Sequence, residues 1–94
     1  MDVADTPRRS ARVLAQQAAD SLLLLDPESG RYYTLDEVGA RIWALCDGDR
    51  SIAEIVSALC EEYDAPPGDV ESDARELLDE LAGERLVVDG TAAR

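Results

Sequence analysis

The side chains that most often perform enzyme chemistry are scarce in this 94-residue chain. It contains no histidine, the residue that most often serves as a general base near neutral pH and as a metal ligand. Its two cysteines, Cys46 and Cys60, are too few for a structural zinc site, and their spacing matches no redox motif. Carboxylates are so abundant that no pair of them is distinctive. We therefore predict no catalytic, metal or cofactor site and no enzymatic activity.

The charge of the chain is strongly negative, with 21 acidic and nine basic residues and a net charge of −12. Such a chain repels phosphate backbones, whereas nucleic-acid-binding domains usually carry a basic surface. The first residues lack the apolar run of a signal peptide, and the longest apolar run, residues 22–25, is far too short to span a membrane. We expect a single soluble, cytoplasmic domain that binds neither nucleic acid nor membrane.

Three short segments in the first part of the chain favour strands, after a polar stretch over residues 1–10 that is typical of a flexible arm. Residues 12–18 alternate weakly, residues 22–25 are uniformly apolar, and residues 31–35 have high strand propensity. The sequence Asp26-Pro27-Glu28-Ser29-Gly30 is typical of a turn. We predict a three-stranded antiparallel sheet in which the last two segments form a hairpin.

Three helices are predicted next, each marked by capping residues and an apolar stripe. Asp36 suits the N-cap of the first helix, and Gly48 suits its left-handed C-terminal end. Ser51 and Glu54 have the spacing of a capping box at the start of the second helix. The stripes are Leu35, Val38, Ile42, Leu45 and Cys46; then Ile52, Ile55, Val56, Leu59, Cys60 and Tyr63; and then Val70, Ala74, Leu77, Leu78 and Leu81.

The last apolar run, Leu86-Val87-Val88, predicts a short terminal strand or an extended segment that packs on the core. The expected organisation is thus an arm over 1–10, one domain over 11–90 and a tail over 91–94. Both cysteines fall at apolar positions of predicted helices, so we interpret them as reduced core residues. A disulfide between neighbouring helices is the alternative.

Strands followed by three helices at this length indicate an α+β fold of the winged helix-turn-helix-like type. The residues in these elements resemble the PqqD family over about Ser21 to Val88. No single run is diagnostic, but their ordered set is specific. The resemblance is carried by Gly30–Glu37, Ile42-Trp43, Leu45–Gly48 and Ser51–Val56, with Tyr63, Val70, Asp73, Leu77, Leu78, Leu81 and Leu86-Val87 downstream.

This resemblance implies a non-catalytic protein that binds the leader of a ribosomally made precursor peptide. The resemblance also implies that the leader pairs as an added strand with residues 31–34 and lies against the third helix. The implied binding residues are Arg31, Tyr32, Tyr33 and Thr34 on the strand, and Val70, Asp73, Ala74, Leu77 and Glu80 on the helix. Alternation puts the two tyrosines on opposite faces, so one fills the core and the other lines the groove, and the sequence does not decide which. An exposed sheet edge also invites self-pairing, so we expect a monomer or a weak dimer.

Members of the PqqD family serve more than one pathway. Some serve lasso peptide pathways with a leader peptidase as partner, and another presents its precursor to a radical enzyme for synthesis of pyrroloquinoline quinone. Tyr32-Tyr33 and Leu45–Gly48 look closer to the lasso group, so we favour delivery to a leader peptidase, with the quinone pathway as the alternative.

The third predicted helix is strongly acidic. Its acidic residues are Asp69, Glu71, Asp73, Glu76, Asp79 and Glu80. Such a run is typical of a solvated helix face, and it also creates a negative field that would steer a basic leader to the groove. Since the span over residues 66–83 contains one basic residue, Arg75, it is a poor candidate for reading DNA.

A carrier protein is a remote alternative. Asp20-Ser21-Leu22 resembles the tripeptide around the phosphopantetheine serine of carrier proteins. In those proteins the serine begins a long helix, whereas here Pro27 and Gly30 stop any helix soon after it.

Overall fold

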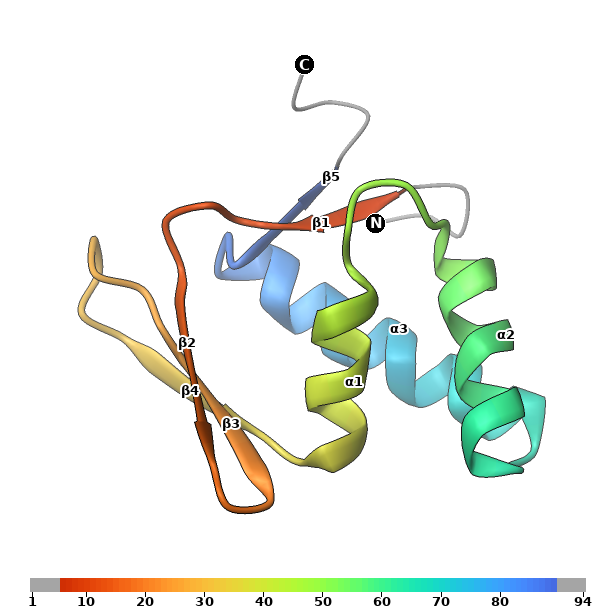
Figure 1. Ribbon diagram of the computed structural model, residues 1–94. Coiled ribbons are helices and arrows are strands. Elements are labelled where there is room, and N and C mark those ends of the chain that lie inside the picture. The colour runs from red at the N-terminus through yellow and green to blue at the C-terminus, as the bar shows by residue number, and fades with distance from the viewer. Residues whose placement is uncertain (1–5, 90–94) are drawn as a thin grey trace.

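The computed structural model describes residues 6–89, in which a three-stranded sheet, three helices and a two-stranded ribbon surround one core (Figure 1). In chain order the elements are β1 (Pro7–Arg9), β2 (Leu14–Ala18), β3 (Ser21–Leu25), β4 (Tyr32–Leu35), α1 (Glu37–Leu45), α2 (Ile52–Tyr63), α3 (Pro67–Gly83) and β5 (Val87–Asp89). The predicted α+β fold, with three antiparallel strands followed by three helices, is confirmed.

The three-stranded sheet is antiparallel in the order β2-β3-β4. Leu14 pairs with Leu25 across β2 and β3, and Leu22 pairs with Leu35 across β3 and β4. Leu24 in the central strand is fully buried, while every residue of β2 is exposed. The sheet therefore has two edge strands, and only β3 and β4 contribute strongly to the core.

Helices α1 and α2 begin where the sequence predicts them because their N-terminal backbone amides find side-chain acceptors, whereas α3 begins at Pro67 without a side-chain cap. Asp36 accepts a hydrogen bond from the backbone N–H of Gly39 at 2.8 Å. Ser51 and Glu54 form the complete capping box at the start of α2. Gly48 follows α1 with a φ of +84°, the left-handed conformation that favours glycine. The predicted N-terminal capping signals are thus confirmed, whereas the C-cap of α1 is Cys46 and the left-handed Gly48 lies two residues beyond it.

Helix α1 packs against one face of the sheet and separates it from α2, and α3 crosses behind them (Figure 1). The buried side chains that join these layers are mainly aliphatic. Trp43 is the one aromatic residue among the buried side chains of the described core. The molecule is only 17 Å thick along its shortest axis, so a ligand has room in surface grooves rather than in a deep cleft. Along the described chain, no helix combines the length and apolar character needed to cross a bilayer.

The N-terminal arm predicted over residues 1–10 is wrong for Pro7–Arg9. These residues form β1, which pairs with β5 so that Pro7 lies opposite Asp89. The Arg9 guanidinium donates to the carbonyl oxygens of Trp43 and Ala44 at 3.2 and 2.8 Å, and so caps the C-terminal end of α1. Pairing between distant segments leaves no local pattern in three residues, so this strand could not be predicted from the sequence. Residues 1–5 of the predicted arm and the predicted tail, 91–94, lie outside the described residues.

Both cysteines are free, as predicted, and they differ in exposure. Burial raises the pKa of the Cys46 thiol to about 12, so almost none of it is the reactive thiolate at neutral pH. We expect iodoacetamide to modify Cys60 alone in the native protein and both thiols after denaturation. Mass spectrometry of the intact protein would count the adducts, with Cys60→Ser as the control that leaves the native protein unmodified. Native labelling of Cys46 at the rate of Cys60 would contradict this packing.

The loop between β3 and β4 is organised by one buried carboxylate. Asp26 is 5% exposed and accepts from the Arg12 guanidinium at 3.1 and 3.2 Å and from the backbone N–H of Glu28 at 3.0 Å. The hydrogen bonds from Arg12 are the main reason that the pKa of Asp26 lies below its ordinary value. The same carboxylate therefore joins the segment before β2 to the loop that orients β4.

Acid should weaken the fold through Asp26. A carboxylate with a lower pKa in the folded than in the unfolded chain adds stability above its unfolded pKa, and this is lost as the pH falls through the folded pKa. We expect Asp26→Asn to lower the thermal midpoint by several degrees at pH 7, and the difference to shrink at about pH 3. Circular dichroism melts would measure both, with the exposed Glu28→Gln as control. An equal deficit at both pH values would show that the charge of Asp26 is irrelevant.

Candidate functional site

Strand β4 lies at an open edge of the sheet, and its backbone has unpaired groups that face outward. The backbone N–H of Asp26 donates to the carbonyl oxygen of Arg31 at 2.9 Å, which marks this pair as hydrogen-bonded. Because hydrogen-bonded and non-hydrogen-bonded pairs alternate in antiparallel sheets, Tyr33 and Leu35 also bond to β3. The N–H and C=O groups of Tyr32 and Thr34 consequently point away from the sheet and can pair with an added strand.

The side chains of β4 alternate between the core and the outer face of the sheet. Tyr33 packs against the core and Leu35 is buried, whereas Tyr32 is 67% exposed and Thr34 is exposed. Tyr33 is therefore the tyrosine on the helix side of the sheet, and Tyr32 lies on the opposite, solvent-facing side. This arrangement resolves which of the two helps to fill the core.

A hollow of about 360 Å³ lies beside β4, between that strand, the start of α1 and the middle of α3. Its lining residues are Thr34, Leu35, Asp36, Val38, Gly39, Ile42, Asp73 and Leu77. The absence of a side chain at Gly39 keeps this junction close, because an added Cβ would lie 3.2 Å from the Cβ of Leu35 and 3.5 Å from Leu77 Cδ2. The predicted strand and the predicted helix wall thus meet at one surface depression.

A second hollow, of about 240 Å³, continues from the first along α1 and α3 to the end of α2. The two share Val38, Ile42 and Asp73, so we treat them as one groove, called here the β4–α3 groove. The second hollow is lined by Val38, Ile42, Leu59, Tyr63, Ala65, Pro66, Asp69, Val70 and Asp73. An extended segment placed along β4 would therefore find apolar surface beyond the end of the strand.

The structure brings together four of the nine residues that the sequence analysis assigned to a binding site. Thr34, Val70, Asp73 and Leu77 line the β4–α3 groove. Among the others, Ala74 is completely buried beneath the groove, and its side chain has no surface to offer a ligand. Glu80 is exposed and lines neither hollow. Arg31, Tyr32 and Tyr33 also lie outside both hollows, so neither tyrosine lines the groove as expected.

The groove also contains residues from α1 and α2 that the sequence analysis placed on apolar stripes and did not assign to the binding site. Val38 falls on the apolar stripe of α1, yet it is 40% exposed and lines both hollows. Tyr63 ends the stripe of α2 and is 36% exposed at the rim of the second hollow. The position of Tyr63 at the end of its stripe could have indicated this exposure, because an apolar residue at the end of a stripe often lies at the margin of the core.

A polar cluster joins the start of β4 to the end of α3. The Arg31 guanidinium donates to Glu84 at 2.6 and 3.3 Å. A hydrogen bond to Glu84 is also the main reason that the pKa of Tyr33 is raised, while hydrogen bonds from Tyr33 and then Arg31 lower the pKa of Glu84. This cluster fixes the strand against the far end of the helix, so it positions the two walls of the groove.

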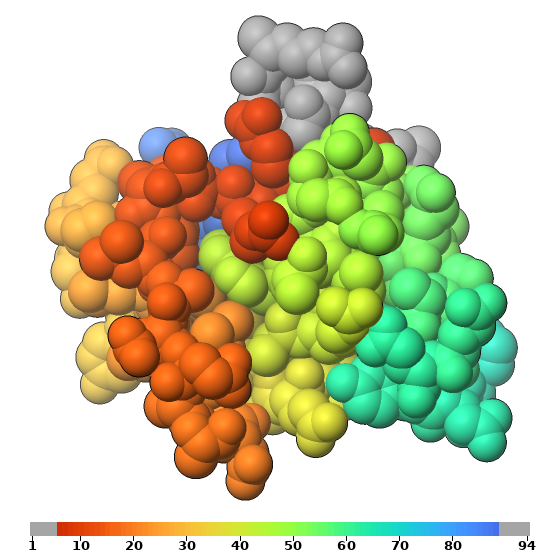
Figure 2. All heavy atoms as spheres, in the orientation of Figure 1, coloured from red at the N-terminus to blue at the C-terminus, as the bar shows by residue number. Residues whose placement is uncertain are grey.

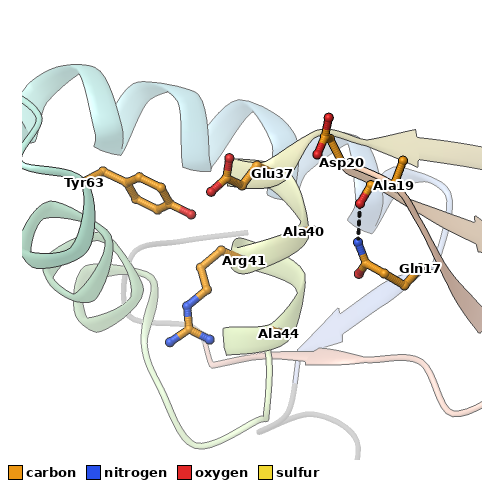
Figure 3. A pocket seen from close by; sticks show the side chains of 8 residues that line it. All are labelled: Gln17, Ala19, Asp20, Glu37, Ala40, Arg41, Ala44 and Tyr63. Carbon is orange, nitrogen blue, oxygen red and sulfur yellow. Dashed lines mark hydrogen bonds between the residues drawn. The ribbon is translucent and has the colours of Figure 1, made fainter.

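Another hollow, of about 470 Å³, opens on a different face of α1, where the β2–β3 hairpin, α1 and the end of α2 meet (Figures 2 and 3). Its residues are Gln17, Ala19, Asp20, Glu37, Ala40, Arg41, Ala44 and Tyr63. The Arg41 guanidinium in it is already bound to Glu62 at 2.8 and 2.9 Å. Small and mixed-charge residues give this depression little that would select a ligand, although Tyr63 borders it as well as the β4–α3 groove.

The chain matches the family model described as Coenzyme PQQ synthesis protein D (PqqD) over residues 21–87. It belongs to the PqqD family. A curated relative from Xanthomonas oryzae pv. oryzae (strain PXO99A), named PqqA binding protein, is 38% identical over 80 residues, which are 85% of each chain. A second PqqA binding protein, from Xanthomonas axonopodis pv. citri (strain 306), is 36% identical over the same share.

Solved structures of PqqD-type proteins share the fold. TbiB1 in complex with the TbiA(beta) leader peptide is 38% identical, with a TM-score of 0.75 over 85% of this chain and 93% of that one. A lasso peptide synthetase B1 complexed with its leader peptide is 25% identical, with a TM-score of 0.77 over 88% and 98%. The PqqD part of Methylobacterium extorquens PqqCD, described as a recognition element for ribosomally synthesised and modified peptides, is 29% identical, with a TM-score of 0.77 over 93% of both.

The position of Ser21 weighs against the carrier-protein alternative. Ser21 begins β3 instead of a helix, and its hydroxyl donates to the carbonyl oxygen of Ala18 at 3.1 Å within the hairpin.

Proposed function

We propose that this PqqD-family protein binds the leader of a ribosomally made precursor peptide at the open edge of β4 and in the β4–α3 groove. The observation that carries the proposal is the edge itself: Tyr32 and Thr34 direct unpaired backbone groups outward beside a groove with apolar walls. Strand addition of this kind uses main-chain hydrogen bonds for affinity and side-chain pockets for selectivity. Two structural relatives of the same fold were solved with leader peptides bound.

In this role the protein is a non-catalytic adaptor in the cytoplasm that presents its peptide to another enzyme. We favour a leader peptidase of a lasso peptide pathway as that enzyme, because TbiB1 and the lasso synthetase B1 protein share the fold. The names of the Xanthomonas relatives favour a second candidate, in which the ligand is PqqA and the pathway makes pyrroloquinoline quinone.

Fluorescence polarisation would test the proposal and separate the two pathways. The labelled probes are the TbiA(beta) leader peptide, PqqA, and the leader and core halves of the small peptide encoded beside this protein. We expect saturable binding of the leader half and none of the core half. Preference for the TbiA(beta) leader over PqqA would support the lasso pathway, and the reverse preference would support the quinone pathway. Failure to bind any probe, with the protein shown to be folded, would contradict leader recognition.

The acidic face of α3 gives the binding reaction an expected salt dependence. Raising the ionic strength from about 0.01 to about 0.15 M shortens the Debye length from about 30 to about 8 Å and screens exposed charges. We expect the association rate of a basic leader to fall a few-fold, with little change in its dissociation rate, because long-range attraction acts mainly on encounter. Stopped-flow polarisation at several salt concentrations would measure both rates. An association rate that does not change with salt concentration would contradict the steering role of α3.

A further inference from the structure

A polar hollow of about 380 Å³ lies where β4 begins and α3 ends, at the opposite end of the strand from Leu35. Arg12, Arg31 and Arg85 line it, so it contains three of the nine basic residues of a chain that has 21 acidic ones. The hollow is open above Gly83, where an added Cβ would meet no other heavy atom within 4 Å. A peptide that pairs with β4 and continues beyond the start of the strand would therefore reach a surface rich in arginine.

Arg85 is the arginine of this hollow that has no acidic partner among residues 6–89. Arg12 is bound to Asp26 at 3.1 Å, and Arg31 is bound to Glu84 at 2.6 Å. The side chain of Arg85 is exposed, and within the same range of residues it forms no ion pair. Its guanidinium can therefore take a carboxylate from a ligand without breaking a contact of the described fold.

The backbone of Arg85 has a conformation that arginine rarely adopts. Its φ is +61°, in the left-handed region where side chains other than glycine are strained. Its N–H donates to the carbonyl oxygen of Ala82 at 3.0 Å, and the N–H of Leu86 donates to that of Leu81 at 2.9 Å. These two bonds form the Schellman motif that ends α3, and glycine is the preferred residue at the position of Arg85. The fold alone would favour glycine here, and strained residues of this kind are concentrated at ligand-binding sites.

The edge of β4 leaves the register of an added strand open. Within β4, the outward backbone groups belong to Tyr32 and Thr34, so a peptide shifted by two residues can still form part of the same ladder. A charged contact just beyond the end of the strand would distinguish these registers. The chain has a net charge of −12, so most of its surface repels an acidic group, and a carboxylate held at Arg85 has few competing positions.

We propose that Arg85 binds the carboxylate of an aspartate or glutamate in the leader, just beyond the residues that pair with β4, and so fixes the register of the added strand. This inference rests on the proposed function and deepens it, since it names a specificity-determining residue and the acidic residue that the leader supplies. Arg12 and Arg31 keep their own partners and shape the hollow.

A displayed library of random linear peptides, selected on the full chain, tests the proposal without a known leader. Peptides that bind at the β4 edge are those whose binding is lost with Thr34→Pro. We expect them to carry aspartate or glutamate at a constant distance from their strand residues. The affinity of one such peptide is then measured for the wild type, for Arg85→Gln and for Arg75→Gln. The last variant is a matched control, because it also removes a guanidinium from the C-terminal half of the domain but lies outside the hollow.

The expected pattern is a coupling between Arg85 and the carboxylate of the peptide. Changing that carboxylate to an amide should weaken binding to the wild type and to Arg75→Gln by about two- to fivefold, and should change binding to Arg85→Gln little. Moving the acidic residue by one position should cause the same loss, because successive side chains of a strand point to opposite faces. Arg85→Gly should show the binding defect of Arg85→Gln and melt a few degrees above the wild type, since glycine relieves the left-handed strain.

Three results would overturn the assignment. If the amide peptide loses affinity equally for the wild type and Arg85→Gln, or if the β4-binding peptides carry no acidic residue at a constant distance, Arg85 does not set the register, although leader binding stands. If Arg85→Gly melts below the wild type, the arginine serves the fold instead of a ligand. If no peptide is enriched, both this inference and the proposed function fail.

Discussion

Thr34→Pro is expected to weaken leader binding by about tenfold or more and to leave the domain folded. Thr34 lies on the edge strand, and the alternation of the β3–β4 ladder turns its N–H away from the sheet. Proline removes that donor and places its ring where the added strand must approach. The internal ladder keeps its hydrogen bonds, because they belong to Tyr33 and Leu35. Fluorescence polarisation with the leader peptide gives the affinity, and circular dichroism gives the fold.

Two further variants isolate the backbone effect. Thr34→Val keeps the N–H and the branched shape of the side chain, so its affinity should remain that of the wild type. Tyr33→Pro removes an N–H that points to β3, so it should lower the thermal midpoint, unlike Thr34→Pro. Normal binding by a folded Thr34→Pro protein would show that the leader does not add to β4 as a strand.

Leu77→Asp is expected to reduce leader binding by at least about tenfold, because it changes the wall opposite β4 from apolar to charged. Leu77 lines the hollow beside Thr34 and Leu35 and packs on the core from its half-buried position. A carboxylate there would lie in the same hollow as Asp73 and would repel apolar leader residues. Polarisation titrations below the melting temperature of each variant would measure the loss.

The control for this second prediction must separate loss of folding from loss of contact. Leu77→Met conserves volume and apolar character, so it should bind nearly as the wild type does. Leu77→Ala removes apolar contact without adding charge and should show an intermediate loss. If Leu77→Asp melts as the wild type does and binds the leader equally well, the leader follows another path across α3.

The parts of the fold that the sequence predicted are those in which local chemistry decides the structure. Asp36, Ser51 and Glu54 satisfy backbone groups within one turn of themselves, so the starts of α1 and α2 follow from a few neighbouring residues. The loop from Asp26 to Gly30 likewise uses its own short-range hydrogen bonds, with Gly30 at a φ of +76°. Strand β1 escaped prediction because its partner, β5, lies at the other end of the chain.

The site was predicted in outline and missed in detail for a related reason. Periodicity indicates which face of a helix is apolar, but it does not show where neighbouring helices stop covering that face. Val38 and Tyr63 therefore counted as core residues, although the structure leaves them exposed around a hollow. Ala74 was assigned to the groove by the family resemblance, and the structure shows it completely buried instead. The link between Arg31 and Glu84 joins residues 53 positions apart and has no local signature.

The pairing of β1 with β5 bears on how the domain forms as the ribosome makes it. The register joins Pro7 to Asp89, so the ribbon cannot close until almost the whole described chain has emerged. The entropy lost in closing such a long loop must be overcome before the contact stabilises the fold. We therefore expect the β1–β5 ribbon to form late in folding. The β2–β4 meander depends on neighbouring segments and can form early, with the binding edge already exposed. Its opposite wall, α3, is synthesised later, so a nascent chain holds the edge of the site before it holds the groove.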